Sequence, residues 1–127
     1  MNLTNNNTTL KNINECEQTI GYSFRDKTLL EIALTHTSCR LENNFSNERL
    51  EFLGDAVLGT VISDYLYKYM PNNSEGELTR IKSVVVCQST LAKVSQEAQL
   101  KDFIVLGKGI NDRDFLPKSI LANAFEA

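Results

Sequence analysis

The stretch of sequence that decides the fold reads Glu48-Arg49-Leu50-Glu51-Phe52-Leu53-Gly54-Asp55-Ala56-Val57-Leu58. It opens the longest helical pattern in the chain, which continues to Met70 and stops at Pro71. Shorter helical patterns lie on both sides of it, and no pair of alternating apolar runs predicts a β-hairpin. The sequence therefore predicts an all-α fold.

This long helix is predicted to have two faces of different chemistry. Because an α-helix turns by about 100° per residue, Glu48, Glu51 and Asp55 share one narrow face. Phe52 lies beside these acids, so its ring packs either under a neighbouring element or in a partner protein. The opposite side of the helix is predicted to face the core, and it carries Leu50, Leu53, Val57 and Val61.

The acidic face has two interpretations. One is the solvated face of an ordinary surface helix. The other is a metal site, because Glu51 and Asp55 are four residues apart and repel each other by about 0.2–0.5 kcal/mol, with no cationic partner on the same face. Clustered carboxylates suit hard cations such as Mg²⁺, and two such ions can clamp a phosphodiester during hydrolysis. The unpaired repulsion favours the metal site.

Shorter helices are predicted on both sides of the long one, over residues 10–20, 26–34, 74–87 and 89–100 and from residue 118 onward. Gly21 is predicted to end the first helix, and Asp26 to cap the second. Ser74 and Glu77 form the S-x-x-E pattern of a capping box, and Ser89 is the expected cap of the next helix. These end signals strengthen the all-α prediction.

The length of 127 residues fits one domain. Residues 1–9 are polar and rich in Asn and Thr, so we expect a disordered tail followed by a domain over residues 10–127. The last helix is still running at Ala127 with no cap after it. We therefore expect this domain to be incomplete at its C-terminal end.

The composition excludes several classes of protein. The net charge is −3, which argues against a purely electrostatic nucleic-acid binder, so an RNA partner needs local basic residues, metal ions or a second module. The three cysteines are widely spaced and His36 is the only histidine, which predicts neither a zinc site nor a disulfide framework. A reducing, cytoplasmic location fits this cysteine usage. No apolar run approaches the ~18 residues of a membrane span, so no membrane partner is expected.

At this point the residues resemble a known family. The stretch 48–58 resembles the signature of ribonuclease III. Residues 33–38, 75–80 and 119–127 resemble other segments of that family in the same order, although the family usually has a basic residue at Thr37. The resemblance covers roughly residues 13–127 and implies the helical ribonuclease III endonuclease fold. Two parts of the family have no counterpart in this resemblance: the remainder of the last helix and a double-stranded-RNA-binding domain.

The resemblance implies an endoribonuclease that hydrolyses phosphodiester bonds of double-stranded RNA and leaves 5′-phosphate and 3′-hydroxyl ends. Its cofactor would be Mg²⁺, with Mn²⁺ as a substitute. The resemblance also implies a cytoplasmic homodimer that processes ribosomal and messenger RNA precursors. Two rival interpretations are a non-catalytic dimeric relative that binds RNA, and a fragment without activity.

The resemblance also assigns roles at the metal site. Asp55 and Glu126 would be catalytic, and Glu51, Asn123 and Glu126 would hold the metal. The family usually has aspartate at the position of Asn123. An amide oxygen is still a metal ligand but brings no negative charge, so this departure predicts weaker metal binding.

Other positions would support the site or contact partners. Glu48 and Glu75 match acidic family positions that support the site or contact the substrate, and Phe52 would insert into a cavity of the second subunit. For Glu75 the alternative is an ordinary favourable charge in the first turn of a helix. Arg80 and Lys82 either touch phosphate or are solvated charges on a helix.

Overall fold

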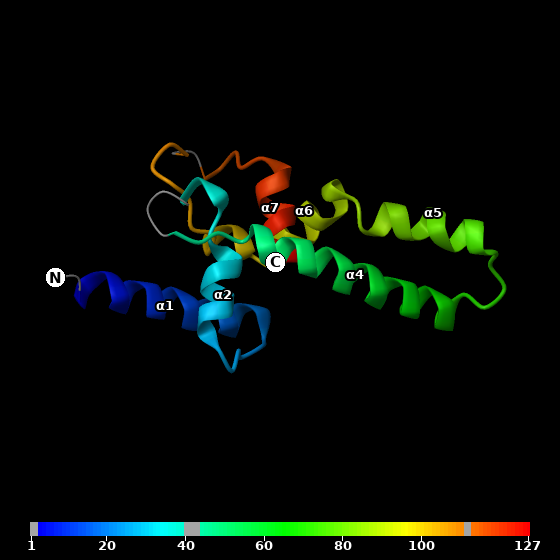
Figure 1. Cartoon of the computed structure of the whole chain (residues 1–127), viewed down its shortest axis with the longest axis horizontal. Helices are drawn as coiled ribbons and strands as arrows, with labels where there is room; N and C mark the ends of the chain where they lie inside the picture. Colours follow the sequence, from blue (N-terminus) through cyan, green and yellow to red (C-terminus); the bar gives the residue numbers. More distant parts are fainter. Residues whose placement is uncertain (1–2, 40–43, 111–112) are drawn as a thin grey trace.

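A computed structural model of the chain describes residues 3–39, 44–110 and 113–127 (Figure 1). Over these residues the only β pairing is an isolated bridge between Thr35 and Val105, so the all-α prediction is confirmed. None of the described helices is both long and apolar enough to cross a membrane. The helices are α1 (Leu3–Ile20), α2 (Lys27–Leu34), α4 (Glu48–Tyr69), α5 (Glu75–Val85), α6 (Gln88–Glu97) and α7 (Lys118–Glu126), with short 3₁₀ turns η1 (Thr37–Cys39) and η2 (Leu100–Asp102).

Helix α1 begins earlier than the sequence predicts. We expected a disordered tail over residues 1–9, but α1 begins at Leu3, so this expectation fails for residues 3–9. Residues 1 and 2 lie outside the described part of the chain. Asn and Thr are weak helix formers, but extending a helix that is already nucleated costs far less than starting one. Growth from the amphipathic segment 10–20 accounts for the longer helix.

Local chemistry sets most helix ends as predicted. Gly21 ends α1 with φ +71°, a left-handed conformation that glycine adopts without steric cost. Asp26 caps α2 by accepting a hydrogen bond of 3.0 Å from the backbone N–H of Thr28. Ser74 and Glu77 form the predicted reciprocal capping box at the start of α5. These ends need only neighbouring residues, which explains why the sequence predicts them.

The start of α6 is the exception. We predicted Ser89 as its cap, but the N-cap residue is Cys87 and the helix runs from Gln88. The carbonyl oxygen of Cys87 already accepts the backbone N–H groups of Thr90 and Leu91 at 3.0 Å each. Helical hydrogen bonding therefore begins two residues before Ser89, whose hydroxyl lies 3.1 Å from the sulfur of Cys87.

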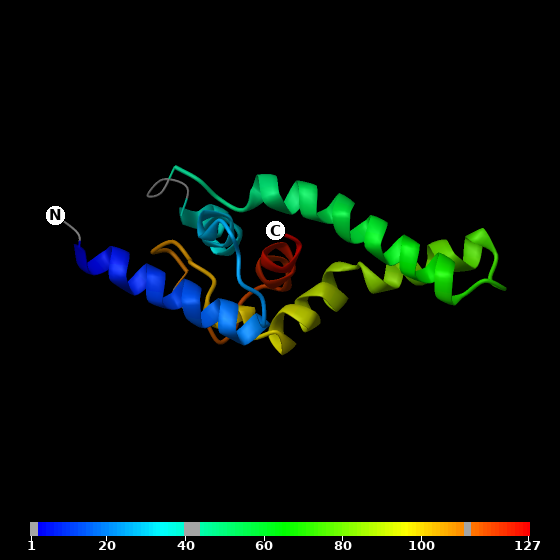
Figure 2. The same cartoon turned by 90° about the horizontal axis from the view of Figure 1, so that it is seen from below.

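Helix α7 lies at the centre of the fold, between α4 and α6 (Figure 2). One core cluster forms around it and consists of Leu91, Ala92, Ile104, Ile120, Leu121, Ala122 and Ala124. A second cluster joins α1, α2 and η2 through Ile13, Cys16, Leu30, Leu34 and Leu100. Phe125 packs against both clusters, so the last turn of α7 is fixed by the whole core.

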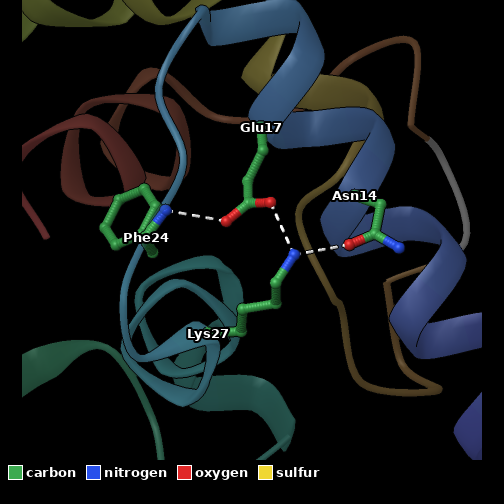
Figure 3. Close-up of polar contacts among 4 residues, drawn as sticks. All are labelled: Asn14, Glu17, Phe24 and Lys27. Atoms are coloured by element: carbon green, nitrogen blue, oxygen red, sulfur yellow. Dashed lines mark hydrogen bonds and ion pairs between the residues drawn. The ribbon is translucent and has the colours of Figure 1, made fainter.

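A buried carboxylate ties α1 to the start of α2 (Figure 3). Glu17 accepts a hydrogen bond of 2.8 Å from the backbone N–H of Phe24 and pairs with Lys27 at 2.7 Å. The ammonium of Lys27 also donates to Asn14 Oδ1 at 2.6 Å. The Lys27 hydrogen bond, helped by the Phe24 N–H, holds the pKa of Glu17 below its usual value. This contact places α2, which leads to the start of α4.

The predicted core stripe of α4 is largely wrong. Leu50 is half-buried, but Leu53, Val57 and Val61 are 58%, 54% and 57% exposed. The helix instead meets the core beside its acidic face, where Leu58 packs against the central cluster. The helix has apolar residues on two sides, and periodicity alone does not say which side α7 covers. Within residues 3–39, 44–110 and 113–127, no element buries the stripe Leu53–Val57–Val61.

Candidate active site

Helix α7 comes very close to α4 at Gly54. A Cβ atom at this position would lie inside van der Waals distance of the Glu126 carbonyl oxygen and 2.6 Å from its carbonyl carbon. Glycine inside a helix is about 0.5–1 kcal/mol less favourable than alanine, so its presence here has a packing reason. The absence of a side chain at residue 54 brings the end of α7 against the acidic stretch of α4.

This approach gathers carboxylates from two distant segments. Burial raises the pKa of Glu51, and the charges of Glu48 and Asp55 raise it further. Burial likewise raises the pKa of Glu126, with further contributions from Asp55 and Glu51. Glu51, Asp55 and Glu126 therefore lie close enough to repel one another, although the last of them comes from the opposite end of the domain.

Glu51, Asp55 and Glu126 have no cationic partner among the residues that the structure describes. Within residues 3–39, 44–110 and 113–127, no Lys, Arg or His forms an ion pair with Glu51, Asp55 or Glu126. The same residues contain no group of three or more His, Cys, Asp or Glu side chains gathered tightly enough to hold a metal alone. Mg²⁺ is usually held by one or two carboxylates, waters and substrate phosphates. The donor set thus fits an open magnesium site that substrate would complete.

Asn123 lies on the same turn of α7 as Glu126. The two residues are three positions apart, so their side chains share one face of the helix, and both are half-buried. The backbone oxygen of Asn123 accepts the Ala127 N–H at 3.0 Å, which keeps this turn helical to its end. The amide is neutral, so as a ligand it would offer an oxygen without adding charge. Its role as a ligand stays a prediction.

The two supporting acids lie in different places. Glu48 is in the first turn of α4, where it accepts a hydrogen bond of 3.0 Å from Ser46 and acts on the pKa of Glu51. Glu75 begins α5, accepts a hydrogen bond of 3.1 Å from Thr79 and lines the groove between α4 and α5. It is not among the charges that raise the pKa of Glu51 or Glu126. The structure therefore places Glu48 next to Glu51 in the carboxylate site and leaves Glu75 outside this site.

The ring of Phe52 is 83% exposed at the edge of this site. It does not pack under another element of the described chain, which removes one of its two interpretations. It lies on the side of α4 next to the acids, about 100° or more around the helix from the exposed stripe Leu53–Val57–Val61.

The sequence did not assign roles to two residues that position the site. Gly54 is one, and its signal was a glycine in the middle of a helix. The other is Asn47, which is 2% exposed and donates from Nδ2 to the Ala33 oxygen at 3.2 Å. Its backbone N–H also donates to the Thr35 oxygen at 2.9 Å. Asn47 thus fixes the start of α4, and with it Glu51, against the end of α2.

Comparison with known proteins shows which family the chain belongs to. The Ribonuclease-III-like family matches residues 26–127. The chain is similar to Ribonuclease 3 of Rhodopirellula baltica, with 44% identity over 91% of the chain and 43% of the relative. It is also similar to Ribonuclease 3 of Caldanaerobacter subterraneus, with 48% identity over 87% of the chain and 50% of the relative. The chain therefore spans about half the length of the curated relatives it matches.

Solved structures agree with this assignment. Two structures of the ribonuclease III nuclease domain from Campylobacter jejuni superpose with TM-scores of 0.82 and 0.80 and identities of 38% and 39%. They cover 90% and 91% of this chain, and the chain covers 79% and 78% of theirs. The chain belongs to the ribonuclease III family and has the fold of its endonuclease domain.

Proposed function

We propose that this chain hydrolyses phosphodiester bonds of double-stranded RNA with Mg²⁺ and leaves 5′-phosphate and 3′-hydroxyl ends. The observation that carries this proposal is the contact at Gly54, which brings Glu126 beside Glu51 and Asp55. Clustered carboxylates without a protein cation are suited to phosphodiester hydrolysis assisted by divalent metal. The family further supports cytoplasmic processing of ribosomal and messenger RNA precursors.

In this proposal each acidic residue has a distinct task. Glu51, Asn123 and Glu126 hold Mg²⁺, with Mn²⁺ as a substitute. When bound, the ion neutralises charge on the phosphoryl oxygens and eases loss of a proton from water. Asp55 is exposed on α4 and accepts a hydrogen bond from the attacking water, which orients it toward phosphorus. Glu48 adds negative charge beside Glu51, which strengthens the attraction of the site for a cation, and Glu75 contacts the RNA farther along the groove.

The test is a cleavage assay with long duplex RNA. The chain is expected to cut the duplex in Mg²⁺, to stop in chelator, and to lose cutting in Asp55→Ala while keeping its fold by circular dichroism. Asn123→Asp is expected to lower the Mg²⁺ concentration needed for half-maximal rate, since it adds a charge to the site. Duplex binding without cutting, both in the natural chain and in Asn123→Asp, would support a non-catalytic RNA-binding relative instead.

The apolar surface of α4 supports the proposal that the chain works as a homodimer. Leu53, Val57 and Val61 are all more than half exposed along one side of the helix, and Phe52 is 83% exposed on the side next to the acids. Large apolar side chains exposed in this number on one helix mark interaction sites, and aromatic residues commonly dominate the energy of such sites. The similar nuclease domain from Campylobacter jejuni has a region involved in dimer formation. We propose that Phe52 inserts into the second subunit.

Phe52→Ala is expected to weaken the dimer by about thirtyfold or more in dissociation constant, because aromatic anchors of interfaces are worth ~2 kcal/mol or more. Sedimentation equilibrium measures this change. Phe115→Ala is a matched control, since Phe115 is 84% exposed but lies outside α4. A natural chain that stays monomeric, or equal weakening by both variants, would contradict the assignment.

A further inference from the structure

A half-buried lysine between α4 and α5 has no task in the mechanism above. Lys82 of α5 lines a groove of about 1000 Å³ between these helices, together with polar residues such as Ser63 and Thr79. Its ammonium crosses toward α4 at Gly59 and lies 3.5 Å from the position that a Cβ would occupy there. In the part of the chain that the structure describes, no carboxylate forms an ion pair with Lys82.

The ammonium of Lys82 lies next to the ridge of α4 that carries the carboxylates. Glu51, Asp55 and Gly59 are spaced four residues apart, so they form one ridge along α4. Gly59 lies four residues after Asp55, which is about 6 Å along the helix axis. The Lys82 charge therefore continues the line of the acidic site rather than lying on a separate face.

A duplex RNA that enters this site needs a cation beside the carboxylates to offset the repulsion of its phosphates. The chain has a net charge of −3, and the site itself presents several clustered carboxylates, which repel phosphate. Double-stranded RNA is recognised mainly through its shape, phosphates and 2′-hydroxyls, and lysine binds phosphate as a point charge. We propose that Lys82 binds a non-bridging oxygen of a phosphate next to the one that is cut. This inference rests on the proposed function and adds a substrate-binding residue to it.

Arg80 offers a contrast on the same helix. It lies two residues before Lys82, which places it about 200° away around α5. Its side chain is exposed and does not line the groove. The two basic residues that the sequence left equivalent are thereby separated: Lys82 faces the RNA path, and Arg80 is a solvated charge.

The experiment compares Lys82→Met, Lys82→Arg and the matched control Arg80→Met in the full chain. Methionine keeps an apolar stem in the groove, so the fold is expected to survive, which thermal unfolding checks. Binding of a duplex RNA is measured in chelator over a series of salt concentrations, and KM and kcat are measured in Mg²⁺. Lys82→Met is expected to weaken binding about tenfold and to reduce the slope of log affinity against log salt by about one. It should raise KM with little change in kcat.

Two further results define the outcome. Lys82→Arg is expected to restore binding and salt slope, whereas Arg80→Met should resemble the natural chain in both. Unchanged affinity and slope in Lys82→Met, or equal losses in Arg80→Met, would overturn the inference even if the chain cuts RNA normally. Normal duplex binding by the natural chain without any cutting would count against the proposed hydrolysis alone, because the salt slope still tests Lys82.

Discussion

Gly54→Ala is expected to abolish RNA cleavage and to destabilise the fold by about 1–3 kcal/mol, the usual cost of forcing an extra methyl group into a packed contact. The added Cβ would meet the carbonyl group of Glu126, which is backbone and has no flexible end to move aside. Helix α7 would have to shift away from α4, and displacement of a catalytic group by about 1 Å can cost 10²-fold in rate. The stability lost through this steric clash should exceed the gain of about 0.5–1 kcal/mol that alanine normally brings to a helix in place of glycine.

Chemical denaturation and the duplex cleavage assay measure the two effects. Gly76→Ala is the matched control, because a Cβ at that position in α5 has nothing within 4 Å. It is expected to keep full activity and to lose no stability. A Gly54→Ala protein that unfolds and cuts RNA like the natural chain would show that α7 does not need this close approach.

Glu51→Gln and Glu126→Gln are expected to lose RNA cleavage, on the order of 10²–10³-fold each, as when one group that stabilises transition-state charge is removed. The same variants should be more stable than the natural chain in metal-free buffer. The pKa of both carboxyls is raised in the folded chain by burial and by neighbouring acids, so their ionised forms oppose folding at neutral pH. Glutamine keeps the shape and removes the charge.

The raised pKa values also predict a pH dependence. As pH falls from 7 through the folded-state pKa of each carboxyl, the folded chain takes up protons before the unfolded chain does, which relieves this destabilisation. The stability difference between the natural chain and either variant should therefore shrink in this window, above the ordinary value of 4.5. Thermal unfolding between pH 7 and pH 5 measures it.

Mg²⁺ provides a readout that is independent of cleavage. It should raise the unfolding temperature of the natural chain, since a ligand that binds only the folded state stabilises it, and should do so less in both variants. Glu97→Gln removes a carboxylate from an exposed position on α6 and is expected to change neither property. Lower stability of Glu51→Gln and Glu126→Gln without metal would contradict the repulsion described for this site.

The exposed stripe of α4 shows where sequence reasoning reached its limit. Leu53, Val57 and Val61 have the spacing of a core face, and they are exposed in the single chain. A helix with apolar residues on two sides can bury either side, and the choice depends on elements that approach from elsewhere. Here α7 takes the side next to the acids, because Gly54 allows it to come close.

Most helix ends and the acidic face of α4 were determined by the sequence alone, whereas the starts of α1 and α6 were not. Asp26, Ser74 with Glu77, and Gly21 act through residues within one turn, and the helical period places Glu51 and Asp55 together before any folding is considered. Only the tertiary structure decided that Glu126 joins them, that Asn47 holds the start of α4, and that Lys82 rather than Arg80 turns toward α4. These contacts join segments far apart in the chain, and their geometry follows from how closely two helices pack, which periodicity and capping signals do not encode.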